Sequence, residues 1–414
     1  MGKTIIEKII SNHTRENVAP RRIVWMDLDI RSARDFGGPN VVKNFEREYS
    51  GEKVNDPFRT CFTFDLVVPA KNIPYANNQQ ICRKFAEGQR IKVYDVDRGI
   101  GSHILLEKGL CIPGSTVVGT DSHLNILGAV EALGQGMGDQ DITFAFKTGK
   151  TWFEVPETIK INIKGTFSYP VTAKDLTLAV LKKLGASGAL GKAIEFYGEA
   201  IENLSLAERI TLCSMATEMG AICAVIPPNK AILDYCKQRS ENREIEPIFA
   251  DSDAEYRQFM EIDINGLQPQ ISVPPRPDNI RDVSEIKEVK IDFAFLGSCT
   301  NGRFEDFEVA AEILKGKKVA SGVMMSAVPA TREVYGELLE KGLLKIFFDA
   351  GVIVSNPGCG GCASGHIGMT GKGEVQISTG NRNFPGKQGA GFTYLASPAT
   401  VAASAVYGEI VSPE

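Results

Sequence analysis

Three of the nine cysteines lie in glycine-rich, polar loops, where the backbone can approach a ligand closely. Cys359 and Cys362 belong to the stretch SNPGCGGCASG, and Cys299 belongs to the stretch SCTNGR. In a chain without an export signal, a CxxC pair more often binds metal or carries out redox chemistry than forms a structural disulfide. The spacing leaves three alternatives open: an iron–sulfur cluster, a zinc ion with His366 as a fourth ligand, or structural or redox thiols.

The number of these thiols bears on the chemistry. Structural zinc normally has four protein ligands, and only three good ones are present. Three cysteines on the four irons of a cubane cluster would leave one iron free to bind a substrate as a Lewis acid. The remaining cysteines lie mainly among apolar neighbours and fit small core residues. They are Cys61, Cys82, Cys111, Cys213, Cys223 and Cys236.

The last third of the chain alternates segments typical of strands with segments typical of helices. This alternation predicts a parallel, doubly wound sheet, in which ligands bind beyond the carboxyl ends of the strands. Cys299 follows the first of these strands, Cys359 the third and Arg382 the fourth, so we expect the three segments to converge on one site. Strands are predicted at 289–297, 318–328, 352–358 and 374–379, and helices at 304–316, 331–351 and 398–408.

The rest of the chain divides into two further regions. Residues 159–164 alternate isoleucine with polar residues, which predicts a half-buried strand. Residues 207–226 have the apolar spacing of a helix, and the stretch 270–285, rich in proline and charge, is predicted to be a linker. We therefore expect three domains. They cover residues 1–155, 156–284 and 285–414.

Composition limits the class of protein. The 414 residues are 43% hydrophobic and 23% charged, which is ordinary for a globular protein that can bury sizeable cores. The net charge is −5 and no basic run occurs, so we expect no nucleic-acid partner. The isoleucines of residues 5–10 have helical spacing among charges, which predicts an amphipathic helix and not a signal peptide. No apolar stretch is long enough to cross a bilayer, and we expect a cytoplasmic protein with no membrane partner.

Six sequence motifs resemble those of the aconitase superfamily, and the resemblance covers essentially the whole chain. The combination of CTNGR with a later CxxC and NRNF is highly specific. The resemblance is strongest to the group that contains the large subunits of 3-isopropylmalate dehydratase and homoaconitase. The motifs are GSCTNGRFEDFEVAAEIL, NPGCGGC, GNRNFPGKQG, YLASPATVAASAVYGEI, GTDSH and DVDRGIG.

The resemblance implies three α/β/α-type domains with mainly parallel sheets around one central [4Fe-4S] cluster, held by Cys299, Cys359 and Cys362. It implies a hydro-lyase that moves a hydroxyl between adjacent carbons of a 2-hydroxy dicarboxylic acid, as in leucine biosynthesis. A homoaconitase or a dimethylmalate-type dehydratase is the alternative within the family. An alternative of another class is a non-catalytic iron–sulfur sensor.

The resemblance also implies roles for residues outside the cysteines. Arg382 would bind a substrate carboxylate, and Asn381 would lie near cluster and substrate. Asp121 and His123 match a carboxylate–imidazole pair, while Glu195 matches an acid that supports a second histidine. The expected catalytic residues are Asp121, His123, Asp65, His103 and Glu195, and the expected substrate-binding residues are Arg382, Asn381, Lys387, Arg303 and Arg34.

Single-chain members of the superfamily carry a further, mobile domain that nothing in this chain matches. The resemblance therefore implies a separate small subunit of the swivelling type, in a heterodimer or heterotetramer. That subunit would complete the active site, supply the catalytic base and set much of the specificity for the side group of the substrate.

Several positions depart from the pattern of the superfamily. Leu66 and Ser102 occupy positions where the superfamily usually has histidines. Asp65 therefore lacks the histidine that usually follows it, and His103 lies one position after the expected histidine. These changes surround the expected pocket while the cysteines remain, so we expect a cluster-bearing protein with an altered substrate or proton path. The other departures are Arg34 for His or Gln, Gly37 for a hydroxyl residue, Ser214 for asparagine and Lys387 for arginine.

Overall fold

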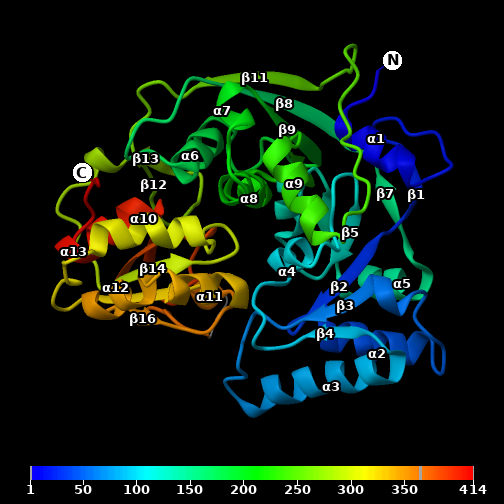
Figure 1. Ribbon diagram of the computed structural model, residues 1–414, viewed down its shortest axis with the longest axis horizontal. Helices are drawn as coiled ribbons and strands as arrows, with labels where there is room; N and C mark the ends of the chain where they lie inside the picture. Colours follow the sequence, from blue (N-terminus) through cyan, green and yellow to red (C-terminus); the bar gives the residue numbers. More distant parts are fainter. Residues whose placement is uncertain (1, 363–365, 414) are drawn as a thin grey trace.

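The computed structural model of the protein describes residues 2–362 and 366–413. Its strands form three mainly parallel sheets and one short ribbon, with helices packed around them. The sheets surround the middle of the molecule, with the N-terminal part along the right side of Figure 1, the central part at the top and the C-terminal part at the left. The predicted α/β architecture with mainly parallel sheets is therefore confirmed.

The first sheet has five parallel strands, in the order β4-β3-β2-β5-β6. An antiparallel ribbon of β1 and β7 lies outside it. The strands are β1 (Ile23–Asp27), β2 (Ile30–Arg34), β3 (Thr60–Thr63), β4 (Lys92–Tyr94), β5 (Thr116–Gly119), β6 (Leu133–Gly136) and β7 (Lys150–Glu154). The helices of this part are α1 (Ile5–Asn12), α2 (Gly38–Glu48), η1 (Pro57–Arg59), α3 (Ile73–Gln89), α4 (Gly101–Glu107), η2 (Leu124–Val130) and α5 (Asp139–Thr148).

The second sheet has four parallel strands, in the order β10-β9-β8-β11. The isoleucines of β8 are buried and alternate with more exposed residues, as predicted for a half-buried strand. The strands are β8 (Glu157–Lys164), β9 (Lys192–Tyr197), β10 (Cys223–Val225) and β11 (Gln258–Asp263). The helices are α6 (Ala173–Leu184), α7 (Glu199–Glu202), α8 (Leu206–Ser214), η3 (Met215–Met219) and α9 (Lys230–Arg239).

The predicted helix over 207–226 is wrong in its second half. Helix α8 ends at Ser214, the tighter turn η3 follows, and the chain reverses at Gly220, whose φ of +82° favours glycine. The apolar residues that come next form β10, which pairs with β9. An apolar run has the same appearance in a buried helix and in a buried strand, so its pattern did not separate the two.

The third sheet has seven strands, in the order β13-β12-β18-β17-β14-β15-β16. The five strands β18, β17, β14, β15 and β16 run parallel to one another. Strand β12 pairs antiparallel with both of its neighbours, β13 and β18. The strands are β12 (Gln270–Ser272), β13 (Ile280–Asp282), β14 (Phe293–Gly297), β15 (Met324–Val328), β16 (Ile353–Val354), β17 (Val375–Ser378) and β18 (Phe392–Ala396). The helices are η4 (Val283–Glu285), α10 (Phe304–Leu314), α11 (Arg332–Glu340), α12 (Leu343–Ala350), η5 (Gly360–Cys362) and α13 (Pro398–Tyr407).

Two predictions for this part need correction. The stretch 270–285 is not a free linker, because β12 and β13 extend the third sheet and their isoleucines are buried. The predicted helix over 331–351 is two helices, because Gly342 has a φ of +76° and ends α11 before α12 begins. The predicted start of α13 is confirmed, since the Ser397 hydroxyl accepts a hydrogen bond from the backbone N–H of Thr400 and Pro398 occupies the first turn.

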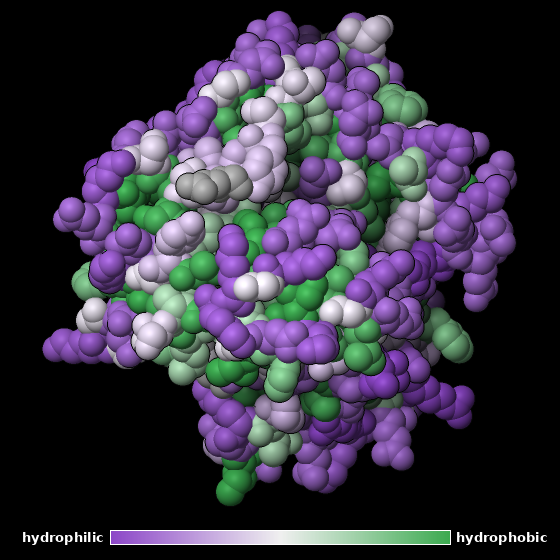
Figure 2. All heavy atoms as spheres, turned by 60° about the vertical axis from the view of Figure 1, so that its left-hand side comes forward, coloured by the Kyte–Doolittle hydropathy of each residue, from purple (hydrophilic) through white to green (hydrophobic). Residues whose placement is uncertain are grey.

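The surface is polar with scattered apolar residues. Figure 2 shows hydrophilic side chains over most of one face, with small hydrophobic areas between them. Within the described residues, no helix combines the length and the apolar character that a membrane span requires.

Glu131 is a buried acid that connects the first sheet to a distant loop. It is fully buried at the end of η2, where its Oε2 atom accepts a hydrogen bond of 2.8 Å from the backbone N–H of Ile248. Burial raises the pKa of Glu131 to about 8. The folded protein therefore keeps this carboxyl protonated at pH values at which the unfolded chain has already ionised it.

We expect Glu131→Gln to remove a pH-dependent loss of stability. Between the ordinary pKa of 4.5 and the folded pKa of about 8, the folded state binds more protons than the unfolded state, so stability falls as pH rises. Glutamine cannot ionise, and the free energy of unfolding in urea should fall less over this range than in the wild type. The exposed Glu340→Gln variant is the control, and equal slopes for Glu131→Gln and the wild type would contradict the prediction.

Candidate active site

The structure brings the three loop cysteines together. Cys299 follows β14, while Cys359 and Cys362 follow β16, and β15 lies between these two strands. The three side chains are buried in one small cluster with Ile100 and Ala330. Thiols from segments sixty residues apart in sequence thus lie together at the carboxyl ends of parallel strands. This is where ligands were expected to bind in a sheet of this kind.

The CxxC turn depends on glycine for its tight packing. Gly360 begins the 3-10 turn η5 with a φ of +58°, a conformation that favours glycine. A Cβ atom at this position would lie 2.6 Å from the ring of Phe295 on β14. The absence of a side chain therefore lets the turn lie directly on the sheet. The stretch SNPGCGGCASG is described through Cys362, and its last three residues lie outside the described residues.

Polar groups from distant segments point at the sulfur atoms. The Nη2 atom of Arg34 lies 2.7 Å from the Sγ atom of Cys359, and the Nδ2 atom of Asn381 lies 3.5 Å from that of Cys299. The hydroxyl of Ser214 lies 3.8 Å from the Sγ atom of Cys299. Burial raises the pKa of the Cys299 thiol to about 12. These thiols therefore need a nearby cation or metal to become thiolates.

The donor set of this site consists of thiols with N–H donors beside them. Thiolates are the ligands of iron–sulfur clusters and also bind zinc. The proposed fourth zinc ligand, His366, instead has its Nε2 atom 3.3 Å from the Oδ1 atom of Asn356. Three thiols with N–H donors around them are a suitable set for a cluster.

Arg34 connects the sulfur atoms to two buried acids. Its Nε atom lies 2.7 Å from an oxygen of Asp65, and its Nη1 atom lies 3.0 Å from an oxygen of Asp121. Asp65 also accepts a 2.7 Å hydrogen bond from the backbone N–H of Gly101, at the start of α4. Burial raises the pKa of Asp65, and the neighbouring carboxylates act in the same direction against the effect of Arg34.

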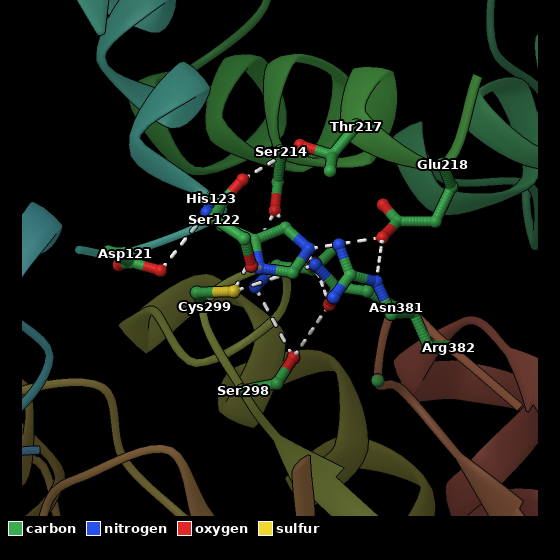
Figure 3. Close-up of polar contacts among 12 residues, drawn as sticks. Asp121, Ser122, His123, Ser214, Thr217, Glu218, Ser298, Cys299, Asn381 and Arg382 are labelled. Carbon is green, nitrogen blue, oxygen red and sulfur yellow. Dashed lines mark hydrogen bonds and ion pairs between the residues drawn. The ribbon is translucent and has the colours of Figure 1, made fainter. Parts of the chain in front are cut away.

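A second ion network joins η3 to the loop after β17, as Figure 3 shows. One oxygen of Glu218 lies 3.1 Å from the Nε2 atom of His123 and 2.7 Å from the Nε atom of Arg382. Burial acts to raise the pKa of Glu218, but the two partners hold it below its ordinary value. Among the described residues, the two terminal nitrogens of Arg382 make no hydrogen bond or ion pair, so they are available to a ligand.

Asn381 has a fixed orientation between these networks. Its Nδ2 atom donates to Ser214 at 3.1 Å as well as to the Cys299 sulfur, and its Oδ1 atom accepts from the hydroxyls of Thr300 and Ser298. The backbone just before it is held by the buried ammonium of Lys174, which donates to the carbonyls of residues 379 and 380 at 2.9 Å each. Both side chains of the Asn381–Arg382 pair are therefore aimed by their neighbours.

Comparison with known proteins identifies the family. The family model described as Aconitase family (aconitate hydratase) matches residues 7–288 and 280–408, which is nearly the whole chain. The chain belongs to the aconitase family. In fold it is similar to the holo-form of Thermococcus kodakaraensis aconitase X, with a TM-score of 0.52 at 14% identity, over 94% of this chain and 88% of that one.

Several curated relatives match this aconitase-family chain along its whole length. The 3-isopropylmalate dehydratase large subunit 1 of Methanopyrus kandleri is 43% identical over 418 residues, covering 100% of this chain and 99% of that protein. The protein of the same name from Archaeoglobus fulgidus is 42% identical over 417 residues, with the same coverage. A probable methanogen homoaconitase large subunit of Methanosarcina mazei is 43% identical over 389 residues, covering 94% of this chain and 98% of that protein.

The carboxylate–imidazole pair of this site differs from the one expected. Asp121 accepts from the backbone N–H of His123 at 3.0 Å and from Arg34, whereas the imidazole of His123 pairs with Glu218. Glu218 was not among the predicted site residues, although it lies in the segment CSMATEMG, four residues after Ser214. The signal was an acid in an otherwise apolar segment, which is uncommon unless the acid is paired.

Glu195 is not part of this site. Its carboxylate accepts hydrogen bonds of 2.8 Å from the hydroxyls of Tyr197 and Tyr256, and the backbone N–H of Ile6 lies 3.4 Å away. No histidine contacts it among the described residues. The expected role of this acid, support of a second histidine, is therefore wrong, because β9 directs the side chain toward the N-terminal helix α1.

The structure gives His103 a structural contact. The Nε2 atom of His103 donates to the backbone carbonyl of Cys299 at 2.9 Å. Burial, together with nearby Arg303, lowers its pKa to about 3. The expected catalytic role of His103 stays a prediction, and what the structure shows is this contact with the backbone of Cys299. It holds the loop that carries Cys299.

Two further expected substrate-binding residues make no hydrogen bond or ion pair with the sulfur atoms among the described residues. The Nη1 atom of Arg303 lies 2.7 Å from an oxygen of Glu107, and the Thr331 hydroxyl donates to the same oxygen. The ammonium of Lys387 makes no hydrogen bond or ion pair among the described residues. The structure thus brings Arg34, Asn381 and Arg382 together at the cysteines.

We expect Glu218→Gln to destabilise the protein by about 2 kcal/mol near pH 7, because it leaves the guanidinium of Arg382 without its counter-charge and weakens the hydrogen bond with His123. The free energy of unfolding in urea measures the loss, and the exposed Glu340→Gln variant is the control. The lowered pKa means that this carboxylate contributes stability above the ordinary pKa of glutamate, and that the contribution is lost as pH falls. The difference in the free energy of unfolding between the wild type and Glu218→Gln should therefore become smaller in acid. A difference at about pH 7 no larger than that of Glu340→Gln would contradict the role of Glu218 as a buried counter-charge.

Proposed function

We propose that this chain is the large subunit of a [4Fe-4S] hydro-lyase that isomerises a 2-hydroxy dicarboxylic acid, most like 3-isopropylmalate dehydratase of leucine biosynthesis. The observation that carries the proposal is the meeting of three buried thiols with Arg382 at the strand ends of the third sheet. The names of the relatives from Methanopyrus kandleri and Archaeoglobus fulgidus support this substrate class. Homoaconitase is the second candidate, because a relative with that name is equally identical.

Cys299, Cys359 and Cys362 would hold the cluster. When bound, such a cluster supplies an iron Lewis acid that binds the hydroxyl and one carboxylate of the substrate and weakens the C–O bond. The amide of Asn381 and the guanidinium of Arg34 would face the sulfur ligands, where N–H donors stabilise thiolates.

Arg382 binds the remaining carboxylate in this proposal. Its Nε atom is occupied by Glu218, so the two terminal nitrogens form a planar fork that suits a carboxylate. Glu218 fixes the direction of this fork and supplies the compensating charge when no substrate is bound. Asn381, one residue earlier, is held by four polar contacts and keeps the loop in place.

His123 is the proposed acid for the departing hydroxyl. Glu218 holds the Nε2 atom of its ring, and the Nδ1 atom lies 3.3 Å from the hydroxyl of Ser122. A protonated ring can therefore deliver the proton from Nδ1 while Nε2–H stays on Glu218. The proton leaving the neighbouring carbon requires a base, which we assign to a separate small subunit in a heterodimer or heterotetramer. The names of the relatives, which call them large subunits, support such a partner.

We expect Cys362→Ser to prevent cluster formation, because a serine hydroxyl is a poor ligand for iron compared with a thiolate. Purified protein is treated with iron and sulfide without oxygen, and the visible absorbance and iron content are measured. The wild type should develop broad visible absorbance that the variant lacks. Cys236→Ala, which removes a thiol from a different hydrophobic cluster, is the control and should behave like the wild type. Equal iron content in Cys362→Ser and the wild type would refute the ligand assignment.

The activity is tested by reconstituting the cluster-loaded chain with a small subunit of the swivelling type and assaying isopropylmalate, homocitrate, citrate and dimethylmalate. We expect turnover of isopropylmalate, and Arg382→Lys should raise its KM on the order of tenfold, since one ammonium cannot replace the planar fork. Arg276→Lys, a surface variant, is the control. Turnover of none of these acids by a cluster-loaded complex would favour the non-catalytic sensor.

A further inference from the structure

We infer that Arg34 is a positioning residue for the cluster, and not a substrate clamp: it ties Asp65 and Asp121 to the sulfur of Cys359 and makes a bound cluster easier to reduce and slower to be lost. This inference rests on the proposed function, because it requires that the three cysteines hold a cluster. It concerns a position at which the residue type departs from the usual pattern of the superfamily.

The geometry of the guanidinium carries the inference. Each of its three nitrogens already faces an acceptor of the protein: Nε faces Asp65 at 2.7 Å, Nη1 faces Asp121 at 3.0 Å and Nη2 faces the Cys359 sulfur at 2.7 Å. Only 12% of the side chain is exposed. A carboxylate clamp needs two free N–H groups on one edge of the guanidinium. Arg34 already uses three of its five N–H groups, at least one at every nitrogen, whereas Arg382 uses only the one on Nε among the described residues.

The charges around Arg34 explain why an arginine is held there. Asp65 is fully buried and Asp121 nearly so, and a buried carboxylate is costly unless it is paired. The guanidinium of arginine is a permanent cation, and here it lies between two carboxylates and a sulfur atom. One guanidinium therefore serves two acids and one sulfur atom.

The residues beside Asp65 leave it no other cation. Leu66 occupies the position where an imidazole is expected, and it packs against the apolar cluster of Ile100, Ala330 and the three cysteines. The hydroxyl of Ser102, at the other expected imidazole, is buried with no hydrogen-bond partner in the described part of the chain. Among the described residues, Arg34 is thus the cation that Asp65 contacts. Its Nη2 atom also contacts the sulfur of Cys359, so the guanidinium connects the two acids to a ligand of the cluster.

The effect on a cluster follows from this bond. An N–H donor and a positive charge at a ligand sulfur stabilise the more negative, reduced form, so they raise the reduction potential. They also make oxidation of the cluster by oxygen less favourable, and this oxidation is the usual start of iron loss. Removing the donor should therefore lower the potential and speed the loss of the cluster.

The test compares Arg34→Gln, Arg34→Lys and the wild type after anaerobic loading with iron and sulfide. The reduction potential is measured by titration with dithionite, which supplies the electron, in the presence of redox dyes, and the half-life of the visible absorbance is measured in air. We expect Arg34→Gln to have a lower potential and a several-fold shorter half-life than the wild type. Arg34→Lys keeps the charge with a single donor group and should lie between the two.

Arg31→Gln is the matched control. Arg31 is a buried arginine on the same strand, three residues earlier, and its guanidinium contacts the carbonyls of Leu28 and Asp56, with none of the three loop cysteines among its described contacts. Its potential and half-life should match those of the wild type, which separates a specific effect at Cys359 from a general loss of packing. If Arg34→Gln does not fold, the comparison of Arg34→Lys with Arg31→Lys decides the question.

The outcomes separate this inference from the proposed function. A potential and half-life in Arg34→Gln and Arg34→Lys equal to those of the wild type would overturn the inference, while activity of the wild-type complex would leave the function standing. A raised KM at unchanged potential would make Arg34 a substrate clamp and overturn the inference as well. A shifted potential in a complex that turns over none of the acids would support the inference and contradict the function. Failure of the wild type to take up iron would overturn both.

Discussion

Charge balance inside a buried centre is the constraint on which this structure depends. Three thiols and the carboxylates of Asp65, Asp121 and Glu218 lie in a region from which water is largely excluded. Unpaired charges are costly in such a place, so each acid must face a cation. Arg34 serves two of the acids, and Arg382 serves the third, which also accepts a hydrogen bond from His123. Arg34 and Arg382 are thus needed to stabilise the buried acids of the site in the folded protein, in addition to any role in binding a ligand.

The arrangement of the sheets makes this centre possible. Arg34 ends a strand of the first sheet, Glu218 belongs to the second region, and the cysteines follow strands of the third sheet. Each segment alone has only one or two polar groups, which water could satisfy. Only where the three regions meet do these groups lose water and become dependent on each other. The site is therefore a product of packing between regions and not of any single motif.

Membership of the aconitase family and the departures from its usual pattern fit together in this picture. The family model matches nearly the whole chain, including the segments that carry the cysteines, Asn381 and Arg382. The departures at residues 34, 66 and 102 lie together around Asp65, where one cation and an apolar side chain replace the expected imidazoles. Changes that compensate each other in this way preserve the charge balance.

The amino-acid sequence by itself determined the α/β architecture, the strand-end positions of the three cysteines and the start of α13 at Ser397. These features follow from local periodicity, capping chemistry and the rule that parallel strands share one carboxyl edge. Other features were decided only by the tertiary structure: that His123 pairs with Glu218 and not with Asp121, that Glu195 faces α1, that His103 holds a carbonyl, and that residues 270–282 extend a sheet. The physical reason is that a side chain's hydrogen-bond partner comes from whatever distant segment packs against it. Residue type and spacing state what a group can bind, and the packing of remote segments selects which partner it meets.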